Sequence, residues 1–473
     1  MSFFYNRTFL SAQIGYIILV LLTLIIFPGA HIVYTLLAMI AVWSTTAMIY
    51  KYTPWANRTG WWALLITTAA LSIGAIINIH YFTTIAATST ELPSLLNSDS
   101  SRFYHDALYS IGHPSGISTD IKNHGYGLII SWIWHITGIT IVAPIIINML
   151  LMLLSIILCG GIASLILQNK TPKTTEWIAT CATIMSASIC YFLNSGTLLL
   201  KEAFLIFAFA LIGFTIIALM THKTSRLKKI ILLISFIIGL AIISFMRYNL
   251  LFIPIIGILL LLRKNSLKIG FSLITINIIS ISLVSFILYQ YNLNIPESTT
   301  NIIDGENIAI YYFNVPDQAS YYNILDGYFS YPWWKKIITL PLTAATQYLI
   351  PLPWGFCDDI HFGYTLAYAH IAYPWYIIGG LILYYIIFSP KSPSILKKVT
   401  LWGVLMWLIP AYLFAGIVSR YTLPFLPFLI PSAVYIVATW KQHKFIKKWL
   451  LCYSILLIIA LTITYSLQEG GLS

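Results

Sequence analysis

Two carboxylates, a histidine and a tyrosine lie close together in the first polar stretch of the chain, where residues 97–107 read NSDSSRFYHDA. The side chains of Asp99 and Asp106 can act as a general base, because a carboxylate can take the proton from an attacking hydroxyl. Tyr104 and His105 lie between them and are candidate substrate contacts. Asp99 comes just before a helix-like stretch and can alternatively cap it. We expect Asp106 to lie on that helix.

Three cations stand apart from the other basic residues, each at an end of an apolar span: Lys201, Arg247 and Arg420. An ionisable group in such a place is costly unless it is paired, so each marks a candidate functional site. Glu202 follows Lys201 directly and is either its structural partner or a further substrate contact. A planar guanidinium is suited to bidentate phosphate binding. Three cations on one rim would hold an anionic lipid headgroup such as a polyprenyl phosphate.

A metal site is left open by the sequence. The spacing of His105, His113 and His124 does not match a zinc site. The run of carboxylates and histidine at 358–361 is too short to be specific. Because its spacing from the other histidines does not indicate a metal site, His124 is treated as a candidate substrate contact. The identity of any metal stays unknown.

The composition points to a membrane protein. Hydrophobic residues make up 59% of the 473 residues and charged residues only 8%, whereas soluble domains carry about 25% charged residues. Apolar stretches of about 18 residues or more, the length that crosses a bilayer, recur along the chain. The net charge of +12 comes from basic clusters between these stretches. That is the pattern of cytoplasmic loops, and it argues against a nucleic-acid partner.

The charges also predict a topology. Basic clusters between spans are expected in the cytoplasm together with the N-terminus. Most of the 14 acidic residues fall in two long segments, 85–123 and 293–360, which we place on the opposite face. An arrangement of about 13 spans satisfies every cluster. It places spans near residues 10–27, 31–50, 61–84, 139–168, 177–196, 203–220, 230–246, 249–262, 269–291, 373–390, 399–416, 421–440 and 449–467.

Two shorter apolar stretches, 124–138 and 337–353, do not fit this alternation as spans. We predict that they are juxtamembrane or re-entrant helices on the outer face. The expected fold is a single all-α transmembrane bundle over residues 1–473, with outer loops at 85–138 and 293–372.

Several stretches together resemble the GT-C superfamily of membrane glycosyltransferases, near the protein O-mannosyltransferase and aminoarabinose transferase families. Residues 99–107 are similar to the first outer loop of that family, and 123–138 to its juxtamembrane helix, although the prolines that usually open this helix are missing. Residues 194–202 are similar to its short outer turn. Arg247-Tyr248 and Arg420-Tyr421, each followed by proline, are similar to its helix starts.

The resemblance implies an enzyme that moves a sugar from a polyprenyl-phosphate-linked donor to a glycan, lipid or protein acceptor on the extracytoplasmic side. Asp99 would be the catalytic base or a metal-linked carboxylate, with Asp106 as its rival. Arg247 and Arg420 would contact the donor phosphate. The Ile-, Asn- and Lys-rich composition suggests an AT-rich genome. Together with the lack of an endoplasmic-reticulum retrieval tail, this favours a bacterial inner membrane.

Other functions stay open from the sequence. An O-antigen or polysaccharide polymerase or ligase would share the outer-face chemistry and the lipid-linked sugars. A lipid or solute transporter is less favoured, because its cations should lie at mid-helix depth and its halves should repeat. A purely structural membrane subunit would not need acidic outer segments facing isolated cations.

Overall fold

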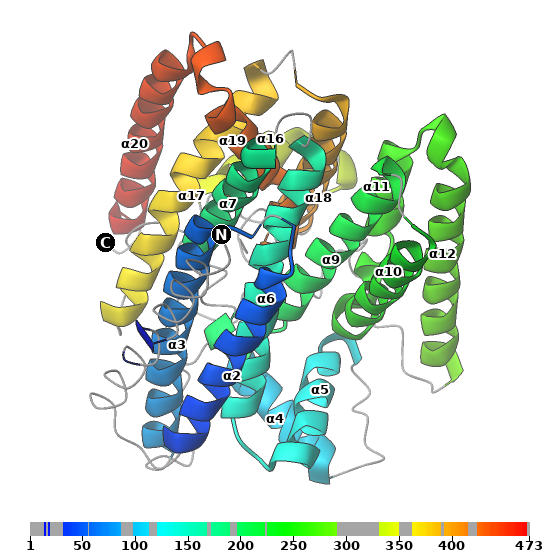
Figure 1. Cartoon of the computed structure of the whole chain (residues 1–473). Helices are drawn as coiled ribbons and strands as arrows, with labels where there is room; N and C mark the ends of the chain where they lie inside the picture. The colour runs from blue at the N-terminus through cyan, green and yellow to red at the C-terminus, as the bar shows by residue number, and fades with distance from the viewer. Residues whose placement is uncertain are drawn as a thin grey trace.

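A computed structural model describes residues 14–15, 18, 32–54, 56–86, 98–112, 121–167, 172–189, 196–222, 225–290, 331–349, 362–388, 392–414 and 423–470. All regular secondary structure in these ranges is helical (Figure 1). The predicted all-α class is therefore confirmed for the described part of the chain.

Seven helical segments of the described chain are long and apolar enough to cross a membrane. They are Thr59–Ile76, Val142–Leu167, Glu202–Thr221, Arg226–Leu250, Lys264–Phe286, Ser394–Tyr412 and Ile446–Ile463. Each exceeds or meets the roughly 18 apolar residues that a bilayer crossing requires. The chain is an integral membrane protein, as the composition predicts.

A helix lies at each predicted span after the first, which falls mostly outside the described residues. These helices are α2 (Ile32–Lys51), α3 (Arg58–Ala86), α6 (Val142–Leu167), α7 (Pro172–Ser188), α9 (Glu202–Thr221), α10 (Arg226–Arg247), α11 (Ile253–Leu261), α12 (Leu267–Gln290), α17 (Phe362–Phe388), α18 (Ser394–Phe414), α19 (Leu426–Ala438) and α20 (Ile446–Gly470). Helix α11 has 9 residues and is about 13 Å long, which is short for a crossing. The total number of crossings stays a prediction.

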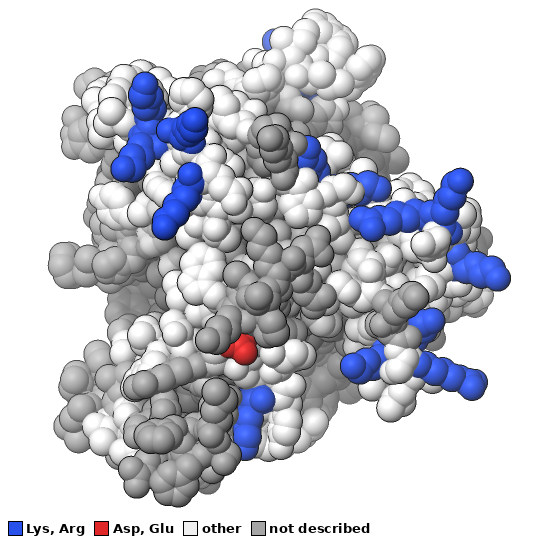
Figure 2. All heavy atoms as spheres, turned by 45° about the horizontal axis from the view of Figure 1, so that its top comes forward, with Lys and Arg blue, Asp and Glu red and all other residues white. Residues whose placement is uncertain are grey.

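The exposed basic side chains lie at alternate connections of the bundle. They are Lys51, Arg226, Lys228, Lys229, Arg263, Lys264, Lys268, Lys397, Lys441, Lys444, Lys447 and Lys448. Because successive helices run in opposite directions, alternate connections lie at the same end. Figure 2 shows this end, where Lys and Arg side chains gather and acidic ones are scarce. We call it the basic face.

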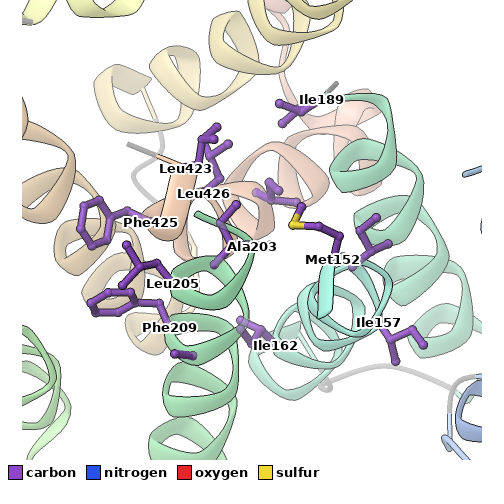
Figure 3. Close-up of a cluster of buried hydrophobic side chains, with 14 of the residues drawn as sticks. Met152, Ile157, Ile162, Ile189, Ala203, Leu205, Phe209, Leu423, Phe425 and Leu426 are labelled. Atoms are coloured by element: carbon purple, nitrogen blue, oxygen red, sulfur yellow. The ribbon is translucent and has the colours of Figure 1, made fainter. Parts of the chain in front are cut away.

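The core of the bundle is formed around α6, α9 and α19. Apolar side chains from these helices meet in Figure 3, among them Met152, Leu205 and Leu426, which are all buried. The ring of Phe425, just before α19, lies 5.3 Å from that of Phe209 in α9, edge to face. This contact holds the start of α19 beside the first half of α9.

Two further helices, α4 (Ser98–Gly112) and α5 (Ile121–Thr137), pack together at the end away from the basic face (Figure 1). A Cβ atom added at Gly127 would lie 2.7 Å from the Cβ of Asp106, so the glycine allows α4 and α5 to approach closely. A Cβ atom at Gly125 would overlap the carbonyl oxygen of Phe245 at 1.7 Å, so α5 also touches the last turn of α10. The stretch predicted as a juxtamembrane helix at 124–138 is thus helical.

The second such stretch forms α16 (Trp333–Leu349), and its last turn is inserted among other helices. Gln347 Nε2 donates to the carbonyl of Trp407 in α18 over 2.6 Å. Trp375 Nε1 in α17 donates to the carbonyl of Tyr348 over 2.9 Å. Because both partners lie near the middle of long helices, the end of α16 reaches the interior of the bundle.

Candidate functional site

The non-helical turn before α9 delivers two charged side chains to the interior. Lys201 is 4% exposed and Glu202 is 2% exposed. The helical residues just before this turn pack closely on their neighbours, because a Cβ atom at Gly196 would meet Leu71 of α3 and Met152 of α6 at 2.9 and 3.1 Å. Buried charges are rare in proteins unless they are paired or functional. The start of α9 is therefore the first element of the candidate site.

Asn148 in α6 fixes this turn. Its side-chain Nδ2 donates to the carbonyls of Leu198 and Leu200, over 2.8 and 3.1 Å, and to the hydroxyl of Tyr126, over 2.8 Å. Asn148 is 0% exposed, so these bonds form without competition from water. One amide thus joins α6 to α5 and to the backbone that precedes Lys201.

Aromatic side chains of three helices contact one another beside Lys201. Its Nζ lies 5.4 Å from the ring centroid of Phe103 in α4, within the range of a cation–π contact. Phe103 meets Tyr126 edge to face at 5.1 Å, and Tyr126 meets Phe204 of α9 at 5.7 Å. These contacts bring α4, α5 and α9 together around one cation.

Two carboxylates lie beside these rings. Asp106 is one turn after Phe103 on the same face of α4, and its backbone packs against Gly127. The Oδ2 atom of Asp106 and the Oε2 atom of Glu202 are both shielded from solvent. Burial raises the pKa of Tyr126, the hydrogen bond from Asn148 opposes this shift, and the charge of Glu202 adds to it. The phenol of Tyr126 therefore stays protonated beside a carboxylate.

Arg247 ends α10 next to this cluster. It is half-buried, and two residues before it Phe245 touches Gly125 and packs edge to face on Trp132 of α5, with ring centroids 5.8 Å apart. An arginine in the last turn also suits the negative end of the helix dipole. These contacts place the last turn of α10, which ends at Arg247, beside α5.

The remaining predicted site residues are placed in part or not at all. Asp99 lies in the first turn of α4, one turn before Phe103 on the same face, and its side chain lies outside the described residues. Helix α4 begins at Ser98, so Asp99 is inside the helix and not ahead of it. His124 belongs to α5, again without a described side chain, and Arg420 lies outside the described residues altogether.

The two candidate contacts on α4 point away from the Lys201 cluster. Tyr104 is half-buried and meets the ring of Trp134 in α5 at 5.2 Å. His105 is exposed. Burial raises the pKa of Tyr104. Neither residue shares the face of α4 that carries Phe103 and Asp106, so their role as substrate contacts stays a prediction.

Within the described ranges, no group of three or more His, Cys, Asp or Glu side chains is arranged to hold a metal ion.

Three residues of the cluster were missed by the sequence reasoning: Phe103, Tyr126 and Asn148. Asn148 carries a signal in hindsight, because it is a polar amide within the apolar run 139–168. Amides in membrane helices usually bond to other helices. Phe103 and Tyr126 carry no such signal, since aromatic residues are common throughout the chain.

The fold and the site define an integral membrane helical bundle with two buried charges, Lys201 and Glu202, at the start of α9. Comparison of the chain with protein-family models, with curated proteins and with solved structures finds no match. The function must therefore be inferred from the site itself.

Replacing Asn148 with leucine should lower the free energy of unfolding by about 2–4 kcal/mol, because two carbonyls and one hydroxyl would lose a buried donor. The measurement is thermal or denaturant unfolding of the purified protein in detergent. The matched control is Asn277→Leu in α12. Asn277 is also 0% exposed, yet within the described part of the chain its side-chain atoms have no hydrogen-bond partner.

We expect Asn277→Leu to leave stability unchanged or to raise it, because it removes a buried amide that has no partner there. Equal destabilisation by both leucine variants would contradict the role given to Asn148.

Proposed function

We propose that this protein is a glycosyltransferase that moves a sugar from a polyprenyl-phosphate-linked donor to an acceptor hydroxyl at the end of the bundle opposite the basic face. The observation that carries the proposal is the burial of Lys201 and Glu202 against Phe103 and Tyr126, with Asp106 on the adjoining helix turn. A bilayer-embedded enzyme needs such a cluster to handle a charged lipid headgroup at the edge of the membrane.

The cations would bind the donor phosphate. Lys201 supplies a point charge within an aromatic, low-dielectric surrounding, which strengthens its attraction to an anion. Arg247 supplies a planar guanidinium that can bind two phosphate oxygens at once. Arg420 is the third proposed phosphate ligand and precedes α19, whose start packs beside α9 through Phe425. These groups would also stabilise the charge that develops on the leaving phosphate.

A carboxylate on α4 would act as the base. The acceptor oxygen attacks the anomeric carbon, the bond from that carbon to the phosphate oxygen breaks, and polyprenyl phosphate leaves with the bonding electrons. The acceptor proton goes to the carboxylate. Asp106 is favoured for this role because its Cβ packs on Gly127 of α5 and it follows Phe103, the ring beside Lys201, by one helix turn. Asp99 is the second candidate, on the same face of α4.

The finer topology belongs to this proposal. We propose about 13 spans with the basic face in the cytoplasm, which puts the N-terminus inside and the site outside. Helices α4 and α5 would then form the first outer segment of a GT-C-like fold in a bacterial inner membrane. The charge distribution supports this orientation, because cations gather at one end and the site carboxylates lie at the other.

The proposal is tested with the purified protein in lipid vesicles and a panel of radiolabelled undecaprenyl-phosphate monosaccharides. We expect label to move from at least one donor to added envelope glycolipids or peptides, with release of undecaprenyl phosphate. Transfer of whole oligosaccharides from diphosphate-linked donors alone would favour the polymerase or ligase instead. Movement of an intact lipid across the vesicle membrane without cleavage would identify a transporter and overturn the proposal.

A further inference from the structure

The connection between α19 and α20 and the first turn of α20 carry four lysines on the basic face. Lys441, Lys444, Lys447 and Lys448 are all exposed. Residues 423–468 contain no aspartate or glutamate, and neither do residues 362–414 of the neighbouring helices α17 and α18. Helices α17, α18, α19 and the described part of α20 up to residue 468 therefore supply no acid to offset the positive charge here, and Glu176 at the start of α7 is the acid of a neighbouring helix at this end.

The connection has a fixed shape. The hydroxyl of Thr439 lies 2.9 Å from Nε2 of His443, and the backbone amides of Gln442 and His443 bond to the carbonyls of Thr439 and Trp440. The His443 ring packs edge to face on Tyr384 of α17, with centroids 5.4 Å apart. Burial lowers the pKa of His443, so at neutral pH the ring is uncharged and the lysines supply the charge. A rigid arrangement binds a ligand with little loss of entropy.

An exposed apolar surface begins directly beside these lysines. Phe445 is 66% exposed although it lies between Lys444 and Lys447. Helix α20 is joined to α17 near its own start, where Trp449 Nε1 donates to the carbonyl of Gly380 over 3.0 Å and the Tyr453 hydroxyl to that of Tyr376 over 2.8 Å. Exposed apolar residues then continue along the helix at Leu451, Ile455, Leu456, Ile458, Ile459 and Ile463.

We propose that residues 441–448 and the adjoining face of α20 form a binding site for an anionic phospholipid. The lysines fit a negative headgroup, and the apolar residues of α20 fit its acyl chains. Basic residues at the membrane surface attract anionic lipids, and Phe445 would lie at the boundary between headgroups and acyl chains. This inference is independent of the proposed glycosyltransferase activity and concerns the opposite end of the molecule.

The test uses the full-length protein in detergent and native mass spectrometry with added phosphatidylglycerol or phosphatidylcholine of identical acyl chains. We expect the wild-type protein to bind phosphatidylglycerol at least about fivefold more tightly, the size of effect that a few surface charges produce. A variant with glutamine at the four lysine positions should lose most of this preference. The matched control replaces Arg226, Lys228 and Lys229, which are exposed on the basic face at the start of α10, with glutamine.

The control should keep the preference of the wild type. A wild-type protein without preference, or an equal loss in both variants, would overturn the proposal, because the basic face would then lack a distinct site. If the variant with four glutamines does not accumulate, the double variant Lys444→Gln/Lys447→Gln replaces it. Its control is the double variant Lys228→Gln/Lys229→Gln. The same outcomes then decide the question.

Discussion

Replacing Asp106 with asparagine is expected to lower the rate of sugar transfer by about 100-fold or more, the usual contribution of a general base. Asparagine keeps the shape of the side chain, so the close packing of α4 on Gly127 should remain. Only the capacity to accept the acceptor proton is lost. The measurement is transfer from the active undecaprenyl-linked donor in vesicles, together with the affinity of the variant for undecaprenyl phosphate.

We expect this affinity to change by less than about threefold, because the cations that would bind the phosphate are unchanged. Glu176→Gln is the matched control, since Glu176 is a half-buried acid at the start of α7, the other end of the bundle. Full activity in Asp106→Asn, combined with loss in Asp99→Asn, would assign the base to Asp99, about two turns earlier in α4. Full activity in both variants would remove α4 from the chemistry.

Replacing Arg247 with glutamine should weaken the binding of undecaprenyl phosphate by about 10- to 100-fold, the cost of removing a charge-assisted hydrogen-bond donor from an anion. Arg247→Lys should recover only part of this loss, because an ammonium group cannot bind two phosphate oxygens in the geometry of a guanidinium group. Binding can be measured by fluorescence with a labelled short-chain polyprenyl phosphate.

Arg263→Gln, on the opposite end of the bundle before α12, should leave binding unchanged. The lysine variant separates the phosphate role from a helix-dipole role, since any cation at the end of α10 would satisfy the dipole. Full binding in Arg247→Lys together with lowered thermal stability in Arg247→Gln would therefore assign Arg247 to the stability of α10 and not to the donor.

Much of the bundle could be predicted from the sequence, because a span is a local property of an apolar run. The predicted stretches at 139–168 and 203–220 became α6 (Val142–Leu167) and α9 (Glu202–Thr221). Clusters of lysine and arginine set the alternation of the connections for the same local reason. Lys201 could also be singled out from the sequence, as a charge beside an apolar span where an unpaired group is costly.

The partners of the site could not be predicted, since they come from distant parts of the chain. The bond from Asn148 to the carbonyl of Leu198 joins residues 50 positions apart, and the contact of Lys201 with Phe103 depends on how α4 crosses α5. The partners of α16 could not be predicted either. The apolar run at 337–353 predicted a short helix, but the hydrogen bond of Gln347 to Trp407 depends on how the helices pack. An apolar run indicates a span but not which helices pack against it.

Photo-crosslinking with a benzophenone-bearing polyprenyl phosphate, followed by mass-spectrometric mapping of the labelled peptides, tests directly where a phosphorylated lipid binds. We predict label on α4, on α5, on the turn and first residues of α9 at 196–204, and at the end of α10, with competition by unlabelled undecaprenyl phosphate. Competed label confined to the basic face, or equal label along all lipid-exposed helices, would contradict a donor site built around Lys201.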